Sequence, residues 1–355
     1  MIRILLLADT HLGFDYPFRP RIERRRRGPD FFRNFERALE PAYRGEVDLV
    51  VHGGDIFYRS KVPAQLVEMA FMPLRKVADK EIPVYIVPGN HERSAIPFRL
   101  LAGHPNIFIF DQPTCFLLTM RGFTLALAGF PFVRNNIREK FPYMLQQTKW
   151  SAIKADAYLL CIHQSVDGAI TGPRNYTFRG GKDVIDIHDI PAEFAGVLNG
   201  HMHRFQVLEK DLRGKPVATP ILYSGSTERT SFAEKDEKKG YVTLDIQTDG
   251  RNKGAVHAWT FHELPTRPML VLECNTAGMN GKAFESWLKD RLAMIPHDSI
   301  VKIRIHGKLR SELFETIRAE SIRSLAPKTM NISITLVDYR GFGEVRSRSI
   351  QREQF

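Results

Sequence analysis

The chain has 355 residues, 43% of them hydrophobic and 26% charged, and its formal net charge at pH 7 is +11. This length allows one large domain or a large and a small one, and the composition is that of an ordinary soluble globular protein. No apolar run approaches the length of a membrane span, and the three cysteines are too far apart for a disulfide framework. The positive charge favours a polyanionic partner such as nucleic acid or an anionic membrane, although many basic proteins bind no nucleic acid.

The expected cellular location follows from the same features. The apolar stretch ILLLA before Asp9 is too short for the apolar region of a signal peptide. The three cysteines indicate buried or free thiols of a reducing compartment. We therefore expect a cytoplasmic protein that does not span a membrane.

Each predicted strand is followed directly by a polar side chain that can bind a metal ion. Short runs of branched aliphatic residues bounded by Gly and Pro predict buried strands. IRILLLA is followed by Asp9 and His11, VDLVVHGG by Asp55, IPVYIVPG by Asn90 and His91, AYLLCI by His163, and GVLNG by His201 and His203. Taken singly, each has an ordinary interpretation, such as a turn aspartate or a packed core histidine. The whole ordered set is very improbable by chance and predicts a metal site.

Segments with helical periodicity separate the first three predicted strands. The apolar residues between Phe31 and Leu39 share one face, and Asp30 is the expected N-cap of this helix. A second apolar face runs from Val67 to Val77, after Pro63. This alternation predicts an α/β fold with helices packed on a sheet. In such sheets ligands gather beyond the carboxyl ends of the strands, which is where the polar residues are expected to lie.

The number and chemistry of the candidate ligands indicate two ions. One tetrahedral site cannot use all of them, and a carboxylate can bridge two cations. Imidazole and oxygen ligands without a thiolate suit manganese, iron or zinc better than magnesium. Two such ions about 3.5–4 Å apart can clamp a phosphate ester and activate water for in-line attack. The candidates are Asp9, His11, Asp55, Asn90, His163, His201 and His203.

The motifs DTHLG, GGDIF, GNHE, CIHQS and NGHMH together resemble those of the calcineurin-like metallophosphoesterases. Within that superfamily, ADTHLG, VHGGDIF and the segment YSGSTERTSFAEKDEKKGY look most like the SbcD-type DNA repair exonucleases. The resemblance implies a four-layer α/β/β/α sandwich with a small C-terminal α+β cap domain. It also implies a manganese-dependent DNA exonuclease or endonuclease that uses two-metal-activated water in DNA repair or recombination.

The resemblance also implies roles for individual residues. Asp9, His11 and His203 would hold the first ion, Asp55 would bridge, and Asn90, His163 and His201 would hold the second. The ions would be Mn²⁺, with iron or zinc as alternatives. His91 would lie near the scissile phosphate, where it stabilises charge or protonates the leaving oxygen.

The sequence departs from the family pattern at two positions. Glu92 stands where aspartate is common, so a carboxylate that orients His91 is still available. Tyr58 stands where related nucleases carry a second active-site histidine, which leaves open the direction of digestion and the balance of exonuclease and endonuclease activity.

The chain is expected to contain two domains and a tail. Residues 1–264 would form the nuclease domain, residues 268–338 a small β-α-β-α-β domain, and residues 339–355 a basic, flexible tail. In the related nucleases a domain at this position caps the DNA groove; the alternative is an appended stabilising domain. Family members continue into helices that dock on an SbcC-type ATPase, for which this chain has little room. The resemblance also implies a homodimer formed through helices near residues 63–102.

Two loops are candidates for DNA contacts. The stretch RIERRRRGPDFF contains Arg24, Arg25, Arg26 and Arg27, which either bind phosphates or form a solvated loop. The loop from Phe178 to Pro191 either lines the groove or is a plain connection. A phosphatase or small-molecule phosphodiesterase would share every metal motif and remains the alternative function. A scaffold that has lost its metals is a third hypothesis, although no ligand is missing.

Overall fold

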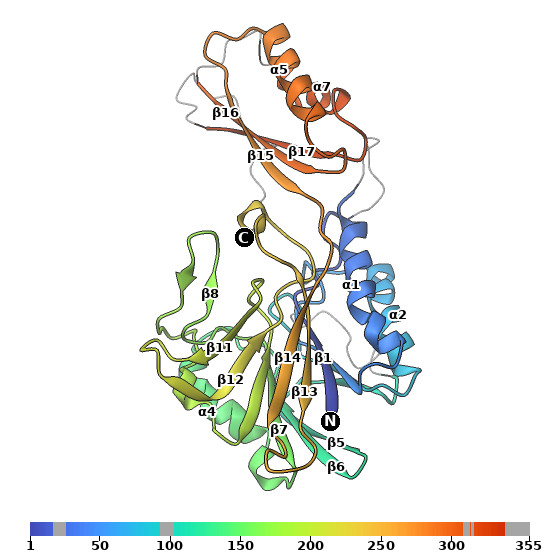
Figure 1. Cartoon of the computed structure of the whole chain (residues 1–355), viewed down its shortest axis with the longest axis vertical. Helices are drawn as coiled ribbons and strands as arrows, with labels where there is room; N and C mark the ends of the chain where they lie inside the picture. The colour runs from blue at the N-terminus through green and yellow to red at the C-terminus, as the bar shows by residue number, and fades with distance from the viewer. Residues whose placement is uncertain (17–25, 93–102, 308–312, 314–315, 338–355) are drawn as a thin grey trace. The chain divides into compact units, whose positions relative to one another are not determined.

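The computed structural model describes residues 1–16, 26–92, 103–307, 313 and 316–337 (Figure 1). The chain divides into two compact units, of which the larger ends at Thr266 and the smaller begins at Arg267. Each unit has its own hydrophobic core. Among the described residues, no helix combines the length and the hydropathy that crossing a membrane requires.

The first sheet of the larger unit has six strands in the order β14-β13-β1-β2-β3-β4. The four strands β1 to β4 run parallel, and β13 and β14 add an antiparallel edge beside β1. Helix α1 (Gly28–Tyr43) connects β1 to β2, and helix α2 (Ala64–Ala78) connects β2 to β3, so the predicted strand–helix alternation is confirmed. The strands are β1 (Ile2–Leu7), β2 (Leu49–His52), β3 (Val84–Ile86), β4 (Ile107–Ile109), β13 (Gly240–Ile246) and β14 (Val256–Glu263).

The second sheet also has six strands, in the order β11-β12-β10-β7-β6-β5. Its four central strands run parallel, while β5 and β11 pair antiparallel with their neighbours at the two edges. Helix α4 (Ile137–Gln147) lies between β6 and β7 in sequence. The strands are β5 (Thr114–Met120), β6 (Phe123–Gly129), β7 (Ala157–Ile162), β10 (Phe194–Asn199), β11 (Gln206–Lys210) and β12 (Pro216–Tyr223).

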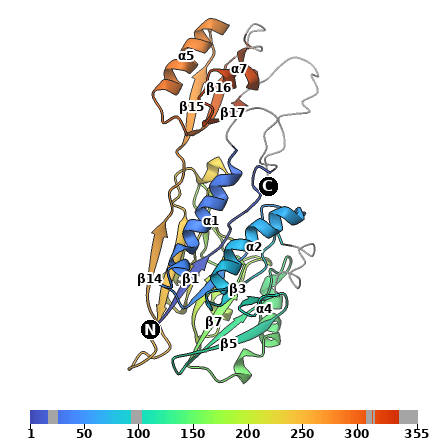
Figure 2. The same cartoon turned by 90° about the vertical axis from the view of Figure 1, so that its right-hand side faces the viewer.

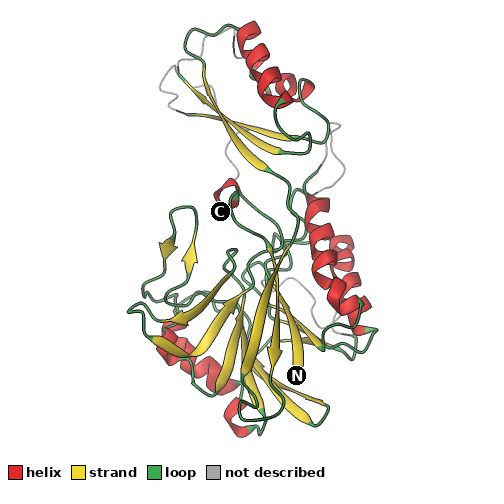
Figure 3. Ribbon diagram, in the orientation of Figure 1, coloured by secondary structure: helices red, strands yellow, loops and turns green. Residues whose placement is uncertain are grey.

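Strand β1 illustrates how the two sheets form layers. Successive side chains of a strand point to opposite faces. Leu5 and Leu7 pack with α1 and α2 in one core cluster, while Ile4 and Leu6 belong to the cluster between the two sheets. A third cluster joins the far face of the second sheet to α4. Helices therefore cover both outer faces, as Figures 2 and 3 show, and the predicted α/β/β/α sandwich is confirmed.

The start of α1 differs from the prediction that Asp30 is its N-cap. The helix begins at Gly28, its N-cap residue is Arg27, and no side chain caps it. Pro29 lies in the first turn, where its fixed φ suits the helix and its missing N–H leaves no hydrogen bond unmade. Asp30 lies in the same turn, where its charge interacts favourably with the helix dipole.

The smaller unit has the element order β-α-β-α-β. Its three parallel strands lie in the order β15-β16-β17, and helices α5 (Gly281–Ala293) and α7 (Ala319–Ser324) lie between them in sequence. Phe284 and Leu288 of α5 pack on Val301 and Ile303. The strands are β15 (Met269–Asn275), β16 (Ile300–His306) and β17 (Asn331–Leu336). A capping role for this unit stays a prediction, and the predicted tail, residues 339–355, lies outside the described residues.

The position of Leu6 between the sheets leads to a stability prediction. Leu6→Ala should lower the free energy of unfolding by about 2–5 kcal/mol, because the neighbours in both sheets cannot fill the cavity. Equilibrium denaturation in urea measures this difference. The matched control is Leu117→Ala on β5, where the leucine is 52% exposed and the expected change is within about 0.5 kcal/mol. Equal losses in the two variants would contradict the assignment of Leu6 to the core.

Candidate metal centre

The candidate ligands follow strands of both sheets, at the ends where the parallel strands finish. Asp9 and His11 follow β1, Asp55 follows β2, and His201 follows β10. All four have positive φ, at 52°, 44°, 53° and 78° respectively. This region is uncommon for residues other than glycine, although Asp and His enter it more readily than most. Such conformations persist only where the surroundings enforce them, and they concentrate at functional sites.

Hydrogen bonds join the two sheets at this end of the sandwich. The backbone N–H of His201 donates to Asp9 Oδ2 at 3.0 Å, which connects the end of β10 to the end of β1. The imidazole Nδ1 of His163, after β7, lies 2.7 Å from the carbonyl oxygen of Gly53, after β2. These contacts hold the ligand-bearing loops of one sheet against those of the other.

The first group of candidates contains Asp9, His11 and His203. The Nε2 atoms of the two histidines are 2.9 Å apart, and they lie 4.0 and 3.9 Å from Asp9 Oδ1. That oxygen is buried and has no hydrogen-bond donor among the described residues. Burial raises the pKa of Asp9 to about 6. A buried carboxylate oxygen without a donor is costly, and a cation between the three side chains would relieve that cost.

The second group surrounds Asn90. Its Oδ1 lies 3.1 Å from His163 Nε2 and 3.0 Å from His201 Nδ1. Burial lowers the pKa of His201 to about 3, so its imidazole is neutral, as a metal ligand must be. Burial also acts to lower the pKa of His163, but the nearby carboxylate of Asp55 outweighs it and raises that pKa to about 9.

Asp55 lies between the two groups. Its Oδ2 is 3.5 Å from His163 Nε2. The carboxylate belongs to one group of possible metal ligands with His11 and His91, and to another with Asp9 and His163. Burial acts to raise the pKa of Asp55, but His163 outweighs it and lowers that pKa. A carboxylate that faces candidates of both groups is positioned as a bridging ligand would be.

His91 is arranged differently from the buried candidates. Its Nδ1 lies 2.6 Å from the carbonyl oxygen of Tyr58, and its backbone N–H donates to Asp55 Oδ1 at 2.9 Å. The carbonyl can only accept, so Nδ1 carries a proton and Nε2 faces the site, 3.7 Å from Asp55 Oδ2. The side chain is 31% exposed, so a substrate can reach it.

Glu92 does not orient His91, contrary to the expectation from the sequence. Its two buried oxygens accept backbone hydrogen bonds from Asp55 at 2.9 Å, Phe57 at 2.9 Å and Gly89 at 2.7 Å. Burial, together with the charge of Asp55, raises the pKa of Glu92 to about 8. Glu92 therefore fixes the loops that carry Asp55 and Asn90, while the Tyr58 carbonyl orients His91.

Glu234 is a site residue that the sequence reasoning missed. Its Oε1 lies 3.1 Å from His203 Nδ1, and its Oε2 pairs with the buried ammonium of Lys239 at 2.7 Å. Lys239 also donates to the carbonyl oxygen of His203 at 2.9 Å. A carboxylate on Nδ1 fixes the tautomer in which Nε2 can bind a metal. Both residues lie in YSGSTERTSFAEKDEKKGY, the segment that contributed to the family resemblance.

The arginine run is only partly described. Arg24 and Arg25 lie outside the described residues. Arg26 pairs with Asp15 at 2.7 Å. Arg27 is 8% exposed, lies over the ring of Phe14 at 4.8 Å and donates to the carbonyl oxygen of Arg229. Arg26 and Arg27 therefore hold the entry to α1 in place, and DNA binding by Arg24 to Arg27 stays a prediction.

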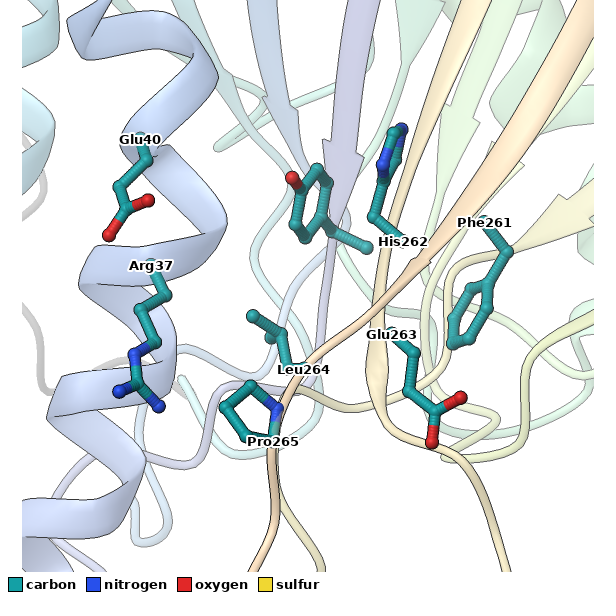
Figure 4. A pocket seen from close by; sticks show the side chains of 8 residues that line it. Arg37, Glu40, Phe261, His262, Glu263, Leu264 and Pro265 are labelled. Carbon is teal, nitrogen blue, oxygen red and sulfur yellow. The ribbon is translucent and has the colours of Figure 1, made fainter.

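A pocket of about 490 Å³ lies elsewhere in the larger unit, between α1 and the end of β14 (Figure 4). None of the candidate ligands lines it. Its lining residues are Arg37, Glu40, Tyr241, Phe261, His262, Glu263, Leu264 and Pro265. The metal centre and this pocket are separate features.

The seven candidates fit a pair of divalent cations. They offer imidazole nitrogens with carboxylate and amide oxygens. All but Asn90 and His201 belong to overlapping groups whose ligand atoms lie within 4.8 Å of one another, and Asn90 Oδ1 joins His201 to His163 at 3.0 and 3.1 Å. The orphaned oxygen of Asp9 belongs to this set. The donor types suit several transition metals and do not select one.

Loss of Asp55 should disturb both ions. In Asp55→Ala we expect fewer than two bound ions per chain after dialysis, because one carboxylate faces both groups. Metal analysis by mass spectrometry provides the count. Asn90→Ala is the comparison, in which the group of Asp9, His11 and His203 should keep its ion. Retention of two tightly bound ions by Asp55→Ala would refute the bridging role.

Loss of the Glu234 carboxylate should weaken metal binding without removing any ligand. We expect Glu234→Gln to lower the affinity for one ion by about 10–100-fold, because His203 loses the partner that fixes its tautomer. Titration with Mn²⁺ against a competing chelator measures the affinity. Glu237→Gln is the control, since Glu237 pairs with Lys239 at 3.0 Å and with Arg204 at 3.1 Å, whereas the His203 ring pairs with Glu234. The same loss in both variants would indicate general damage to the loop and contradict the specific role.

Comparison with known proteins agrees with this geometry. Residues 2–205 match the family described as Calcineurin-like phosphoesterase. The DNA double-strand break repair protein Mre11 of Haloferax volcanii is 29% identical over 289 residues, which cover 79% of this chain and 56% of that protein. The Mre11 protein of Methanocaldococcus jannaschii is 26% identical, with 68% and 61% covered, and that of Methanosarcina mazei is 29% identical, with 88% and 46% covered.

The chain thus spans about half the length of the curated relatives it matches. Among solved structures, a dimetal phosphatase from Danio rerio aligns with a TM-score of 0.43 at 13% identity, over 68% of this chain and 92% of that one. The family match spans more than half of the chain and includes all seven candidate ligands, from Asp9 to His203, so the chain belongs to the calcineurin-like phosphoesterase family.

Proposed function

We propose that the chain is a metal-dependent phosphodiesterase that cleaves DNA, with two divalent ions, most favourably Mn²⁺. The observation that carries the proposal is the convergence of the seven candidate ligands from both sheets on a site where His91 remains accessible. Asp9, His11 and His203 would hold one ion, Asn90, His163 and His201 the other, and Asp55 would contribute to both. The similarity to Mre11 proteins and the net charge of +11 support DNA as the substrate.

The residues of the chain supply orientation and a proton. Bound divalent ions lower the pKa of coordinated water and neutralise charge on phosphate oxygens. His91 keeps one proton on Nδ1 through the Tyr58 carbonyl, so Nε2 is the atom that can exchange a proton with a substrate. A protonated Nε2 can stabilise the phosphate or donate to the leaving oxygen. Glu92 and Glu234 hold the ligand loops and the His203 ring in place.

A phosphatase or small-molecule phosphodiesterase is the alternative, because such an enzyme would use the same metal residues. The basic charge of the chain favours DNA over this alternative, since a small ester needs no extended positive surface. A role in DNA repair rests on the names of the relatives. A homodimer and an SbcC-type ATPase partner stay predictions.

The role of His91 can be tested separately from metal binding. His91→Ala should reduce Mn²⁺-dependent cleavage of end-labelled duplex and single-stranded DNA by about 10²–10⁴-fold, because the proton donor is lost. Its metal content should stay near that of the unsubstituted protein. The control is His104→Ala, whose ring pairs with Asp79 at 3.0 Å, away from the candidate ligands.

Two outcomes would contradict the proposal. Loss of metal together with activity in His91→Ala would reassign His91 as a ligand. Intact DNA alongside rapid hydrolysis of p-nitrophenyl phosphate by the unsubstituted protein would favour the phosphatase alternative.

A further inference from the structure

A small β-hairpin projects from the sandwich next to the candidate metal centre. Its strands β8 (Ile170–Thr171) and β9 (Tyr176–Thr177) pair antiparallel, and the turn between them contains two residues with positive φ, Gly172 at 70° and Asn175 at 52°. Figure 1 shows the hairpin standing clear of strands β11 and β12. Neither strand is long enough to be stable alone, so the hairpin depends on contacts with the rest of the unit.

Those contacts fix the hairpin to the loop that carries His203. The next residue in the chain, Arg204, donates to Asn175 Oδ1 at 2.7 Å and to the carbonyl oxygen of Gly172 at 2.9 Å. Gln206 exchanges two hydrogen bonds with the backbone of Ile170, at 2.7 and 2.8 Å. The Arg204 guanidinium also pairs with Glu237 at 3.1 Å, so its charge is used within the protein. The hairpin therefore keeps a defined position relative to His203.

The exposed side chains of the hairpin have one sign of charge and include an open aromatic ring. The turn carries Arg174, and the segment after β9 carries Arg179 and Lys182, all exposed; the acidic residue that follows, Asp183, accepts a hydrogen bond from the backbone N–H of Asn136 at 2.8 Å. Tyr176 is 61% exposed, although a large aromatic side chain normally buries most of its surface. The edge of its ring contacts Phe178, with the centroids 5.3 Å apart, so one neighbour supports the ring.

We infer that this hairpin binds an unpaired stretch of the DNA strand and guides it to the metal centre. This inference rests on the proposed function. Arg174, Arg179 and Lys182 neutralise phosphates, and the Tyr176 ring stacks on a base. An unpaired strand is favoured over a duplex because the bases inside a duplex cover each other's faces, which leaves the ring nothing to stack on except at an end. The Phe178–Pro191 loop predicted to line the groove begins within this basic segment.

The aromatic contribution is tested with Tyr176→Ala. The variant should bind a labelled oligothymidylate about tenfold more weakly, because one base loses its stacking partner. Its affinity for a covalently closed circular duplex should change less than about twofold, because such a duplex presents no free base face. The matched control is Tyr143→Ala on α4, where the tyrosine is 60% exposed and should contribute to neither affinity. Hydrolysis of bis-p-nitrophenyl phosphate should be the same in all three proteins.

The charge contribution is tested with the triple variant Arg174→Ser, Arg179→Ser and Lys182→Ser. The slope of log affinity against log salt for the oligothymidylate should fall by about 2, since each neutralised phosphate of a single strand contributes about 0.7. The inference is overturned if Tyr176→Ala binds both DNAs as the unsubstituted protein does, or weakens both equally. It is also overturned if the salt slope is unchanged. Failure of the unsubstituted protein to cleave any DNA would instead overturn the proposed function.

Discussion

The architecture of the site depends on two carboxylates, Asp9 and Asp55, that are buried where the sheets meet. Burying a charge away from water is costly unless an opposite charge or hydrogen bonds compensate it. Asp55 is compensated by His163, whose pKa it raises to about 9. Asp9 is compensated only in part, because one oxygen accepts from His201 while the other has no donor among the described residues. This incomplete compensation favours a cation at this position.

A second set of buried ionisable side chains keeps this arrangement rigid. Glu92 accepts three backbone hydrogen bonds, and Glu234 and Lys239 form a pair behind His203. The close packing leaves no room for side chains at two motif glycines. A Cβ atom on Gly54, which has φ of 105°, would collide with the His163 ring, and one on Gly89 would overlap the Asp55 carboxylate. The glycines of GGD and GNH therefore permit the approach of the loops to the ligands.

The basic residues of the chain serve two different purposes. In the sequence the arginine run before α1 is the most conspicuous positive segment, yet Arg26 and Arg27 are used to hold the chain where it enters the helix. The cations in and after the β8–β9 hairpin are less conspicuous in the sequence, yet they are exposed, and Arg204 fixes the turn of the hairpin. A run of like charges is therefore a poor guide to which cations are available to a polyanion.

The sequence by itself determined the strand–helix order, the α/β/β/α sandwich and the set of polar residues at the strand ends. It could do so because those signals are local: an aliphatic run, a glycine and a metal-binding side chain stand within a few positions of one another. Only the tertiary structure decided which buried groups support the ligands. Glu92 reaches Asp55 across 37 positions, Glu234 reaches His203 across 31, and Arg27 reaches Arg229 across 202. No local pattern encodes such pairs, because the partner and the burial that makes it necessary exist only once the two sheets have packed together.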